Sequence, residues 1–369
     1  MSKDPVLIIG GGLAGLTSAL HLAQAGVEVA VYERDTYPRH KVCGEYISNE
    51  VLPYLAQLGV DPFTIGATAI NRCALSSTKG RLVQAPLPLG GFGISRYALD
   101  DYLQQEARRA GVQFVQAEVS AVDYQGGVFR VQTRNGEEVQ SPLVIGAYGK
   151  RSRLDKEQKR DFIQEHAPYL AVKRHFAGDF PDDLVALHNF AGGYCGVSKV
   201  EGGRINVCYL ADYSAFKAYR NIEQFEQAVV CKNPHLSACF ENFTPLFDAP
   251  LTISQISFAE KERVHQHLLM CGDSAGMIHP LCGNGMGMAI SSAQLLSELV
   301  LEYKGGALSD RHALENAYRQ QWQRQFRHRL RAGRVFSRLF ARNQLFDQAV
   351  SLLTHVPWAL PFFIRQTHG

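Results

Sequence analysis

A glycine-rich turn near the start of the chain has the residue types and the spacing to hold the phosphates of a dinucleotide. Gly10, Gly12 and Gly15 form a G-x-G-x-x-G pattern. The first glycine permits the tight turn, the second lets a pyrophosphate approach the backbone, and the third lets helix and strand pack closely. Glu33 follows about 20 residues later, where an acid accepts a hydrogen bond from a ribose 2′-OH. The pattern predicts a dinucleotide site but leaves open whether the ligand is FAD or NAD(P).

The residues around this turn predict a β-α-β unit. Residues 6–9 are an apolar run without alternation, which is typical of a buried parallel strand. An amphipathic helix follows and ends at Gly26, and residues 27–32 form the second strand. The N-terminus of this helix would offer free N–H groups and a partial positive charge to the phosphates.

Length and composition set outer limits on the function. A chain of 369 residues has room for two domains, and its net charge of +3 is too small to argue for nucleic acid. The eight cysteines show no C-x-x-C pair, and His265 and His267 lack further ligands, so we expect a reduced cytoplasmic protein without a metal site. We also expect neither a signal peptide nor a membrane span.

The rest of the chain predicts alternating sheet and helix. Residues 34–48 indicate a charged loop, and residues 70–89 indicate strands with turn signals at Lys79-Gly80 and at Pro86 to Pro88. Residues 169–258 predict an antiparallel sheet that one helix, near 222–230, interrupts. Further strands are expected at residues 112–115, 118–124, 128–133, 143–146 and 267–271, and further helices at 49–58, 97–110 and 285–303.

From residue 309 the sequence predicts helix. Its apolar residues recur at every fourth position, and arginines crowd the remaining positions. We favour a C-terminal helical layer that packs on the domains and keeps a solvated basic face, with a membrane-surface helix as the alternative. The apolar stripe consists of Leu314, Tyr318, Trp322, Phe326 and Leu330.

A second glycine-rich stretch indicates which dinucleotide is bound. A buried strand runs into Gly272-Asp273, and the stretch from Pro280 to Ala289 contains Gly285 at a predicted helix start. This order resembles the second flavin motif of group A flavoprotein monooxygenases and geranylgeranyl reductases. The resemblance implies that Asp273 binds a ribityl hydroxyl and that the helix aims its amides at the flavin N1–C2=O region, where reduced flavin is anionic.

Two shorter stretches resemble the same superfamily. Residues 41–45 look like the loop that passes near the isoalloxazine ring, and residues 93–100 look like the segment whose arginine, here Arg96, approaches the cofactor. The resemblance spans nearly all of residues 1–305. It implies FAD as cofactor and the following cofactor-binding residues: Gly10, Gly12, Leu13, Ala14, Gly15, Glu33, Arg34, Lys41, Cys43, Gly44, Arg96, Val119, Gly272, Asp273, Gly285, Met286 and Gly287.

The fold class that this resemblance implies is α/β + β, similar to p-hydroxybenzoate hydroxylase. A Rossmann-like FAD-binding domain is expected to be interleaved with an antiparallel-sheet substrate domain and followed by C-terminal helices. The FAD-binding domain would take residues 1–75, 96–165 and 264–308. The substrate domain would take residues 76–95 and 166–263, and the helical segment residues 309–369.

The chain also departs from the family pattern. Gly146-Ala147-Tyr148-Gly149 stands where a Gly-Ala-Asp-Gly turn is usual, so the docking of NAD(P)H is open, and no second Rossmann fingerprint is found. Gly276 replaces a histidine common in the monooxygenases, as in the reductase branch. Residues 194–198 replace the aromatic-rich stretch of prenyl reductases, and the W-x-W-x-I-P signature of flavin-dependent halogenases is absent.

The favoured function is that of an FAD-dependent monooxygenase of secondary metabolism. The resemblance implies hydroxylation of a hydrophobic, aromatic or polyketide-like small molecule by molecular oxygen through a flavin C4a-hydroperoxide, with NAD(P)H as reductant. Glu45, Tyr194 and His279 are candidates to orient substrate or relay protons, although a structural role is favoured over a catalytic one for each. The alternatives are an FAD-dependent reductase of carbon–carbon double bonds, and a non-catalytic or membrane-associated flavin-binding protein with peripheral membrane contact through its basic C-terminus.

Overall fold

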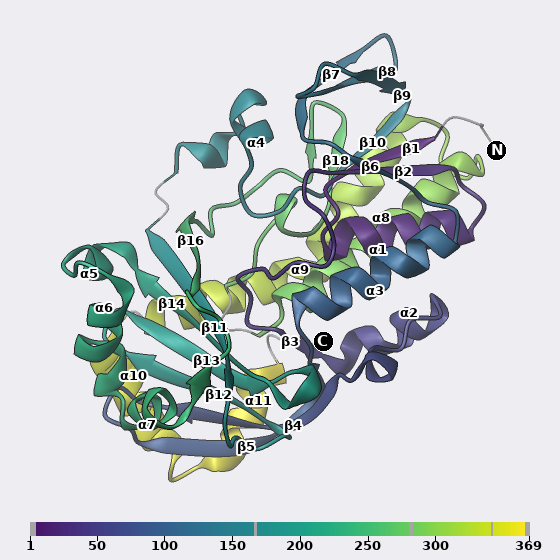
Figure 1. Cartoon of the computed structure of the whole chain (residues 1–369). Coiled ribbons are helices and arrows are strands. Elements are labelled where there is room, and N and C mark those ends of the chain that lie inside the picture. Colours follow the sequence, from purple (N-terminus) through teal and green to yellow (C-terminus); the bar gives the residue numbers. More distant parts are fainter. Residues whose placement is uncertain (1–4, 166–167, 280–282, 341, 366–369) are drawn as a thin grey trace.

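The computed structural model describes residues 5–165, 168–279, 283–340 and 342–365, which form two large sheets with helices around each (Figure 1). The first sheet has the strand order β17-β18-β10-β1-β2-β6. β1, β2, β10 and β18 run parallel, so their carboxyl ends lie along one edge, where α/β proteins bind ligands. The strands are β1 (Val6–Ile9), β2 (Val29–Glu33), β6 (Gln113–Gln116), β10 (Leu143–Gly146), β17 (Val264–His265) and β18 (Leu268–Met270).

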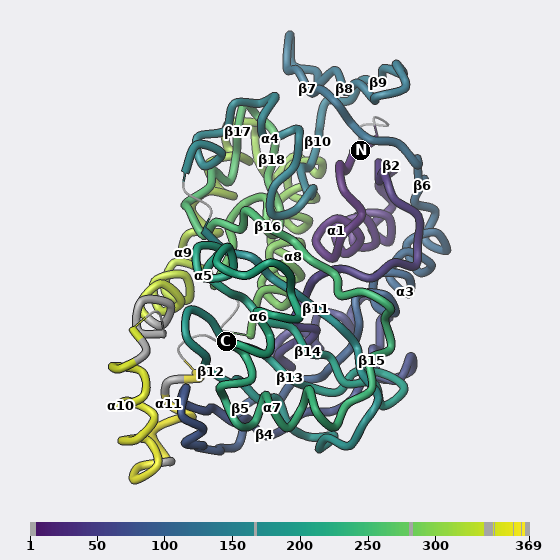
Figure 2. The backbone as a smooth tube through the Cα atoms, turned by 60° about the vertical axis from the view of Figure 1, so that its left-hand side comes forward, coloured from purple at the N-terminus to yellow at the C-terminus, as the bar shows by residue number. Residues whose placement is uncertain are grey.

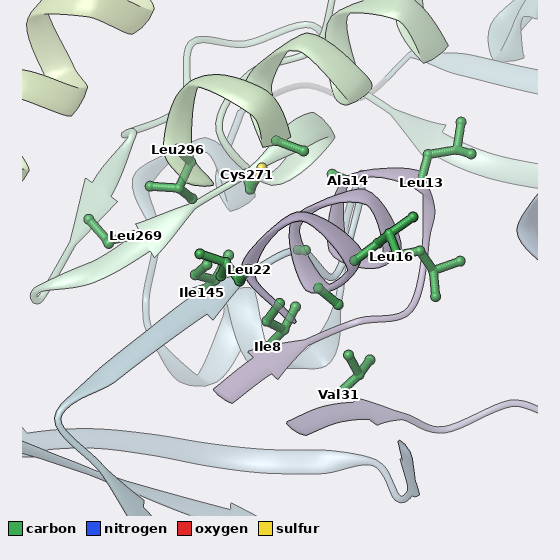
Figure 3. Packing of buried hydrophobic residues seen from close by; sticks show 14 of the residues in the cluster. Ile8, Leu13, Ala14, Leu16, Leu22, Val31, Ile145, Leu269, Cys271 and Leu296 are labelled. Atoms are coloured by element: carbon green, nitrogen blue, oxygen red, sulfur yellow. The ribbon is translucent and has the colours of Figure 1, made fainter. Parts of the chain in front are cut away.

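Three helices, α1 (Leu13–Gln24), α3 (Arg96–Arg109) and α8 (Gly285–Lys304), pack together beside this sheet (Figure 1). Figure 3 shows the core they share, with Ile8 and Ile145 of the strands, Leu16 of α1 and Leu296 of α8 all fully buried. The helix α1 ends before Gly26, whose φ of 81° is the left-handed conformation that glycine adopts without strain. The predicted β-α-β unit is therefore present.

The second sheet is largely antiparallel, with the order β15-β11-β14-β13-β12-β4-β5-β3, and β16 pairs with β11. β12 and β4 are parallel neighbours, which joins two segments far apart in the chain. The strands are β3 (Tyr46–Ser48), β4 (Thr68–Ser76), β5 (Leu82–Gly93), β11 (Tyr169–Ala177), β12 (Leu184–Phe190), β13 (Gly193–Lys199), β14 (Ile205–Asp212), β15 (Thr244–Pro245) and β16 (Leu251–Ile256).

Side chains of the second sheet alternate between two faces. Phe176, Val207 and Phe190 belong to a core that also includes residues of α6 and α7. The opposite face, which we call the inner face, carries Lys173 and Tyr194, and its neighbours follow from the strand register. The inner face consists of Ala171, Lys173, His175, Asn206, Cys208, Leu210, Tyr194, Gly196, Ser198, Val185, Leu187, Asn189, Cys73, Leu75, Val83 and Ala85.

The remaining elements are smaller. A sheet of β7 (Val119–Gln125), β8 (Val128–Thr133) and β9 (Glu138–Ser141) contains the predicted hairpin at Asn135-Gly136, where Gly136 has a φ of 90°. The shorter helices are α2 (Leu52–Gln57), α4 (Arg153–Glu157), α5 (Tyr213–Lys217), α6 (Ile222–Ala228) and α7 (Pro234–Asn242). Single turns of 3-10 helix cover Asn49–Val51, Pro62–Ile65, Asp161–Ile163, Glu201–Gly203, Val230–Lys232 and Gly272–Ser274.

The C-terminal helices join the two parts of the molecule. α9 (Arg311–Phe340) buries the predicted apolar stripe against the core of the first sheet, with Tyr318 and Trp322 fully buried. α10 (Asn343–Leu353) and α11 (Leu360–Arg365), linked through the turn Pro357–Ala359, pack on β4 and β5 of the second sheet. Figure 2 shows α9 and α10 running down one flank of the molecule.

Three local expectations were wrong. Pro86 and Pro88 lie inside β5 rather than at a turn, and they are tolerated because this part of β5 pairs with β4 on one side only. The chain between β14 and β15 holds three helices instead of one, and α7 begins at an Asn233 cap with Pro234 in the first turn. The expected loop 34–48 ends in β3, which pairs with β5.

The sheets do not divide the chain quite where the sequence placed the domain limits. β4 starts at Thr68, before the expected limit at residue 75, and belongs wholly to the second sheet. The domain limits themselves stay a prediction. Among the described residues, every helix is too short or too polar to cross a membrane.

Candidate active site

The glycine-rich turn connects β1 to α1 at the carboxyl edge of the first sheet. Gly10 has a φ of 104°, and a Cβ on it would lie 2.5 Å from the carbonyl oxygen of Ala147. A Cβ on Gly15 would lie 1.9 Å from the Gly10 carbonyl oxygen, so helix and strand pack in contact there. Glu33 Oε2 accepts a hydrogen bond of 2.8 Å from the Gly11 amide. The acid at the end of β2 is therefore placed beside the turn, as the spacing predicted.

Gly12 differs from its neighbours because the space above it is open and bordered by cations. A Cβ there would lie 3.5 Å from Arg96 Nη2 and 4.0 Å from Lys41 Nζ. Both cations bind the buried Asp100, Arg96 with two contacts of 2.7 and 2.8 Å and Lys41 with one of 2.7 Å. The first N–H groups of α1, which have no acceptor within the helix, lie at the same point. Two positive side chains and a helix N-terminus thus face one space, which suits a pyrophosphate.

The charges of this group support each other. Burial alone would raise the pKa of Asp100, but the charges of Arg96 and Lys41 outweigh it and lower that pKa. Burial opposes the charge of Arg96 as well, yet Asp100 and, more weakly, Asp273 raise the pKa of its guanidinium. Burial lowers the pKa of Lys41, and Asp100 partly offsets this effect.

The Gly272-Asp273 motif lies between α1 and α8. Gly272 has a φ of 61°, and a Cβ on it would lie 2.7 Å from the Cβ of Ala14 and 3.6 Å from that of Ala289. Asp273 is half-buried at the end of β18, and its carbonyl oxygen accepts a hydrogen bond from Lys261 Nζ. The two motifs that the sequence singled out are thus in contact, although more than half of the chain separates them.

The start of α8 is connected to the C-terminal helix α9. Asn284, which precedes α8, donates a 2.8 Å hydrogen bond to Glu50 Oε1, and Arg329 binds both oxygens of Glu50 at 3.0 and 2.9 Å. Arg329 was expected on a solvated basic face, but only 17 % of its side chain is exposed. Gly285, Met286 and Gly287 form the first turn, while residues 280–282 of the motif lie outside the described residues.

The loop 41–45 is fastened to the inner face of the second sheet by side chains that the sequence did not reveal. Lys173 Nζ contacts a carboxylate oxygen of Glu45 and donates a 3.2 Å hydrogen bond to the Lys41 carbonyl oxygen. His175 Nε2 lies 2.7 Å from the other oxygen of Glu45. Asn206 Nδ2 donates 2.8 Å to the carbonyl oxygen of Gly44. The only signal for them was that Lys173 and His175 alternate along a strand and therefore share a face.

Glu45 is the centre of this network. Its side chain is fully buried, and the Arg96 amide donates 2.8 Å to its Oε1, which ties the loop to the start of α3. Burial would raise its pKa, but the hydrogen bond from His175 and the charge of Lys173 lower it. Its φ of 54° is left-handed, a strain that occurs at functional sites and persists when the surroundings enforce it. Glu45 therefore holds the loop against the second sheet and the start of α3, and its role toward a substrate stays a prediction.

Tyr194 and His279, the other two candidates, lie together in an aromatic cluster over the inner face. The ring of His279 lies 4.5 Å from that of Phe258 and 6.1 Å from those of Tyr169 and Tyr194. Burial lowers the pKa of His279 to about 4, so its imidazole is neutral at pH 7. Val42 of the loop, Met277 beyond the Gly272-Asp273 motif and Leu210 of the sheet pack into the same cluster.

The remaining predicted residues are scattered around this centre. Leu13 and Ala14 are buried in the first turn of α1, and Cys43 and Gly44 lie in the fastened loop. Val119 is buried at the start of β7. Arg34 is exposed and binds Asp35, so the structure does not bring it to the group over Gly12. The roles of all these residues toward a cofactor stay predictions.

A comparison of the whole sequence with protein families identifies the ligand. A family model described as FAD binding domain matches residues 3–329. The chain belongs to this FAD binding domain family. It is an FAD-dependent oxidoreductase with a mixed α/β fold, as the resemblance of its glycine-rich turn and its Gly272-Asp273 motif to flavin-binding motifs predicted.

Characterised relatives of this FAD-binding chain include oxidoreductases of two kinds. It is 23 % identical to the menaquinone reductase of Mycobacterium tuberculosis, over 80 % of this chain and 76 % of that protein. It is 22 % identical to the 6-hydroxynicotinate 3-monooxygenase of Bordetella bronchiseptica, over 80 % of this chain and 82 % of that protein. A solved flavoprotein/dehydrogenase from Cytophaga hutchinsonii superposes with a TM-score of 0.78 at 18 % identity, over 94 % of this chain and 87 % of that one, which shows the same fold.

The residues over Gly12 fit an FAD pyrophosphate on structural grounds. Gly12 leaves room where Gly10 and Gly15 do not, and the cations Lys41 and Arg96 border that room. When bound, the flavin supplies two-electron redox chemistry, and the protein contributes position, charge and exclusion of water.

Proposed function

We propose that this protein is a monooxygenase that hydroxylates a hydrophobic, aromatic or polyketide-like small molecule with molecular oxygen. One observation carries the proposal. One buried apolar cluster brings together three parts of the chain. It contains Val42 of the loop 41–45, Met277 beyond the Gly272-Asp273 motif, and the inner-face residues Tyr194 and Leu210. An aromatic substrate would lie against this cluster, in a dry environment beside the loop that the family resemblance puts near the isoalloxazine ring.

The chain's own residues divide the work of binding. Arg96 and Lys41, with the N-terminus of α1, would neutralise the pyrophosphate, and Asp273 would accept a hydrogen bond from a ribityl hydroxyl. His279 is neutral at pH 7, so it can hydrogen-bond a substrate hydroxyl without placing a charge in the cluster. We propose NAD(P)H as a transiently docking reductant, since the sequence shows no second Rossmann fingerprint for a separate nicotinamide domain.

A second candidate function, reduction of a carbon–carbon double bond or a quinone, is favoured by one observation. A Cβ on Gly276 would lie 2.7 Å from Cη2 of the buried Trp322, so no side chain fits at this position. The family resemblance gives the monooxygenases a histidine there and the reductases a glycine. The menaquinone reductase among the relatives agrees with this candidate.

Stopped-flow absorbance of the photoreduced holoprotein separates the two functions. The reduced protein is mixed with oxygenated buffer, with and without small phenols, and in a second series anaerobically with prenyl olefins and quinones. Hydroxylation predicts a transient absorbance distinct from reduced and oxidised flavin, followed by a hydroxylated product. Slow reoxidation by oxygen together with rapid anaerobic reoxidation by an olefin or quinone would refute the monooxygenase and support the reductase.

A further inference from the structure

We propose that the C-terminal helices dock this protein on an anionic lipid bilayer. The basis is a group of exposed apolar side chains that we call the C-terminal patch: Val335, Leu345, Leu352, Trp358 and Phe362. Their exposed fractions are 62, 44, 66, 78 and 62 %. Of the large apolar side chains exposed in the described part of the chain, the four most exposed all belong to this patch. Scattered exposed apolar residues are ordinary, but a concentration of them marks an interaction site.

α10 has apolar side chains on two opposite sides. Phe346 and Val350, one helical turn apart, are buried against the strands β4 and β5. Leu345 and Leu352, two turns apart, face away from them and are exposed. Asp347 fixes this orientation, because its carboxylate accepts hydrogen bonds of 2.8 and 2.6 Å from the Thr78 amide and hydroxyl. Folding therefore buries the apolar side chains on the inner side of α10 and leaves those on its outer side exposed.

The turn and helix that follow repeat the arrangement. Leu360 and Ile364, one turn apart, pack toward β5. Trp358 and Phe362, also one turn apart, occupy the opposite side and are largely exposed. An amphipathic segment whose inner side is already packed on a sheet presents its outer side as a preformed surface. Large aromatic side chains such as these settle at the boundary between lipid headgroups and acyl chains.

The positive charge of the C-terminal region favours a bilayer with anionic headgroups. After Glu315 the sequence contains nine arginines and one acidic residue, Asp347, which is already bound to Thr78. A segment that is rich in both basic and apolar residues binds anionic bilayers, since each cation near the surface is attracted by the negative headgroups. The exposed arginines are Arg324, Arg327, Arg331, Arg334, Arg342 and Arg365.

Docking would place the bilayer on the outer side of α10 and α11, whose inner side covers part of the inner face of the second sheet. α10 and α11 pack on Val83, Ala85, Cys73 and Leu75, which continue the same face as Tyr194 of the aromatic cluster. Docking would therefore bring a substrate dissolved in the lipid close to this part of the protein. That consequence rests on the proposed function, whereas docking itself rests only on the surface of the C-terminal helices.

The test uses the full-length holoprotein and the chain's own tryptophans. The sequence has two, Trp322, which is fully buried, and Trp358, which is 78 % exposed. The protein is mixed with phosphatidylcholine vesicles, with or without phosphatidylglycerol, and binding is followed by cosedimentation and tryptophan emission. We expect binding to the anionic vesicles only, weakened by salt, with a blue shift of the emission. Trp358→Phe should keep most of the binding and lose the blue shift.

The double variant Trp358→Ala/Phe362→Ala should lower the partition coefficient about tenfold or more, because it removes two large apolar side chains. Tyr213→Ala, which removes an aromatic ring that is 45 % exposed on α5, is the matched control and should bind as the wild type does. Absence of binding to anionic vesicles, or unchanged binding of the double variant, would overturn the proposal. So would self-association without lipid that the double variant abolishes, since the patch would then serve a second copy of the chain. Anaerobic flavin reduction of the variant should be normal, so failed docking and failed chemistry are told apart.

Discussion

Replacing Lys173 with methionine should lower the free energy of unfolding by roughly 3–5 kcal/mol, the usual cost of removing one partner from a buried ion pair. Lys173 and Glu45 are both completely buried. After the substitution, the Glu45 carboxylate keeps its contacts with the Arg96 amide and with His175 but loses its ammonium partner. Methionine fills most of the lysine volume, so the loss reports on charge more than on packing.

The assay is denaturant unfolding of the protein in excess FAD, followed by circular dichroism, in a double-mutant cycle with Glu45→Gln. The double variant should be more stable than Lys173→Met alone, since glutamine leaves no buried charge unpaired. Lys199→Met is the matched control, because Lys199 pairs with the exposed Asp182, and it should cost about 1 kcal/mol or less. A Lys173→Met variant within about 0.5 kcal/mol of the wild type, or additive effects in the cycle, would refute the reasoning.

Three further predictions concern the cofactor turn, pH and the C-terminal helix. Gly15→Ala should abolish folding or FAD binding, because its Cβ would overlap the Gly10 carbonyl. Gly12→Ala should fold normally but bind FAD weakly in a fluorescence titration. Equal behaviour of the two variants would contradict the assignment of the space over Gly12 to the cofactor. Burial lowers the pKa of His188 to about 3, so below about pH 6.5 the unfolded protein binds a proton at this residue that the folded protein does not. The free energy of unfolding should therefore fall as the pH drops from 6.5 toward 4, by up to about 1.4 kcal/mol per pH unit. His188→Gln should flatten that slope in urea titrations, and an unchanged slope would assign it to other groups. Arg329→Gln should lower the thermal midpoint and weaken FAD binding, because it leaves Glu50 without its bidentate partner at the start of α8; an unchanged FAD dissociation constant would show that this contact is only structural.

The parts of the fold that the sequence predicted are those whose signals are local. The β-α-β unit needs only the apolar run 6–9, the glycines and the acid Glu33, all within one short stretch. The stripe through Tyr318 and Trp322 likewise predicted which side of α9 is buried. The elements against which this stripe packs were not predictable, because a periodic pattern shows only which side of the helix is buried.

What the sequence could not reveal are contacts between distant segments. Lys173 and His175 meet Glu45 only because the second sheet brings β11 against the loop 41–45, and no spacing encodes that approach. The sequence singled out Glu45 as a candidate to orient substrate or relay protons, which stays a prediction, whereas its contacts with Lys173 and His175 depend on partners more than a hundred residues away. Pro86 was misread as a turn residue, because a strand edge and a turn tolerate proline equally well.

The proposed transfer of an oxygen atom to an aromatic compound can be tested with isotopically heavy dioxygen. The holoprotein would be supplied with NAD(P)H and a panel of phenols and aromatic polyketides under the heavy gas, and the products analysed by mass spectrometry. Hydroxylation by this protein predicts a product that carries one heavy oxygen atom and forms only with enzyme, reductant and an aromatic compound present. Consumption of reductant with hydrogen peroxide as the sole product across the panel, while olefins or quinones are reduced without oxygen, would contradict it.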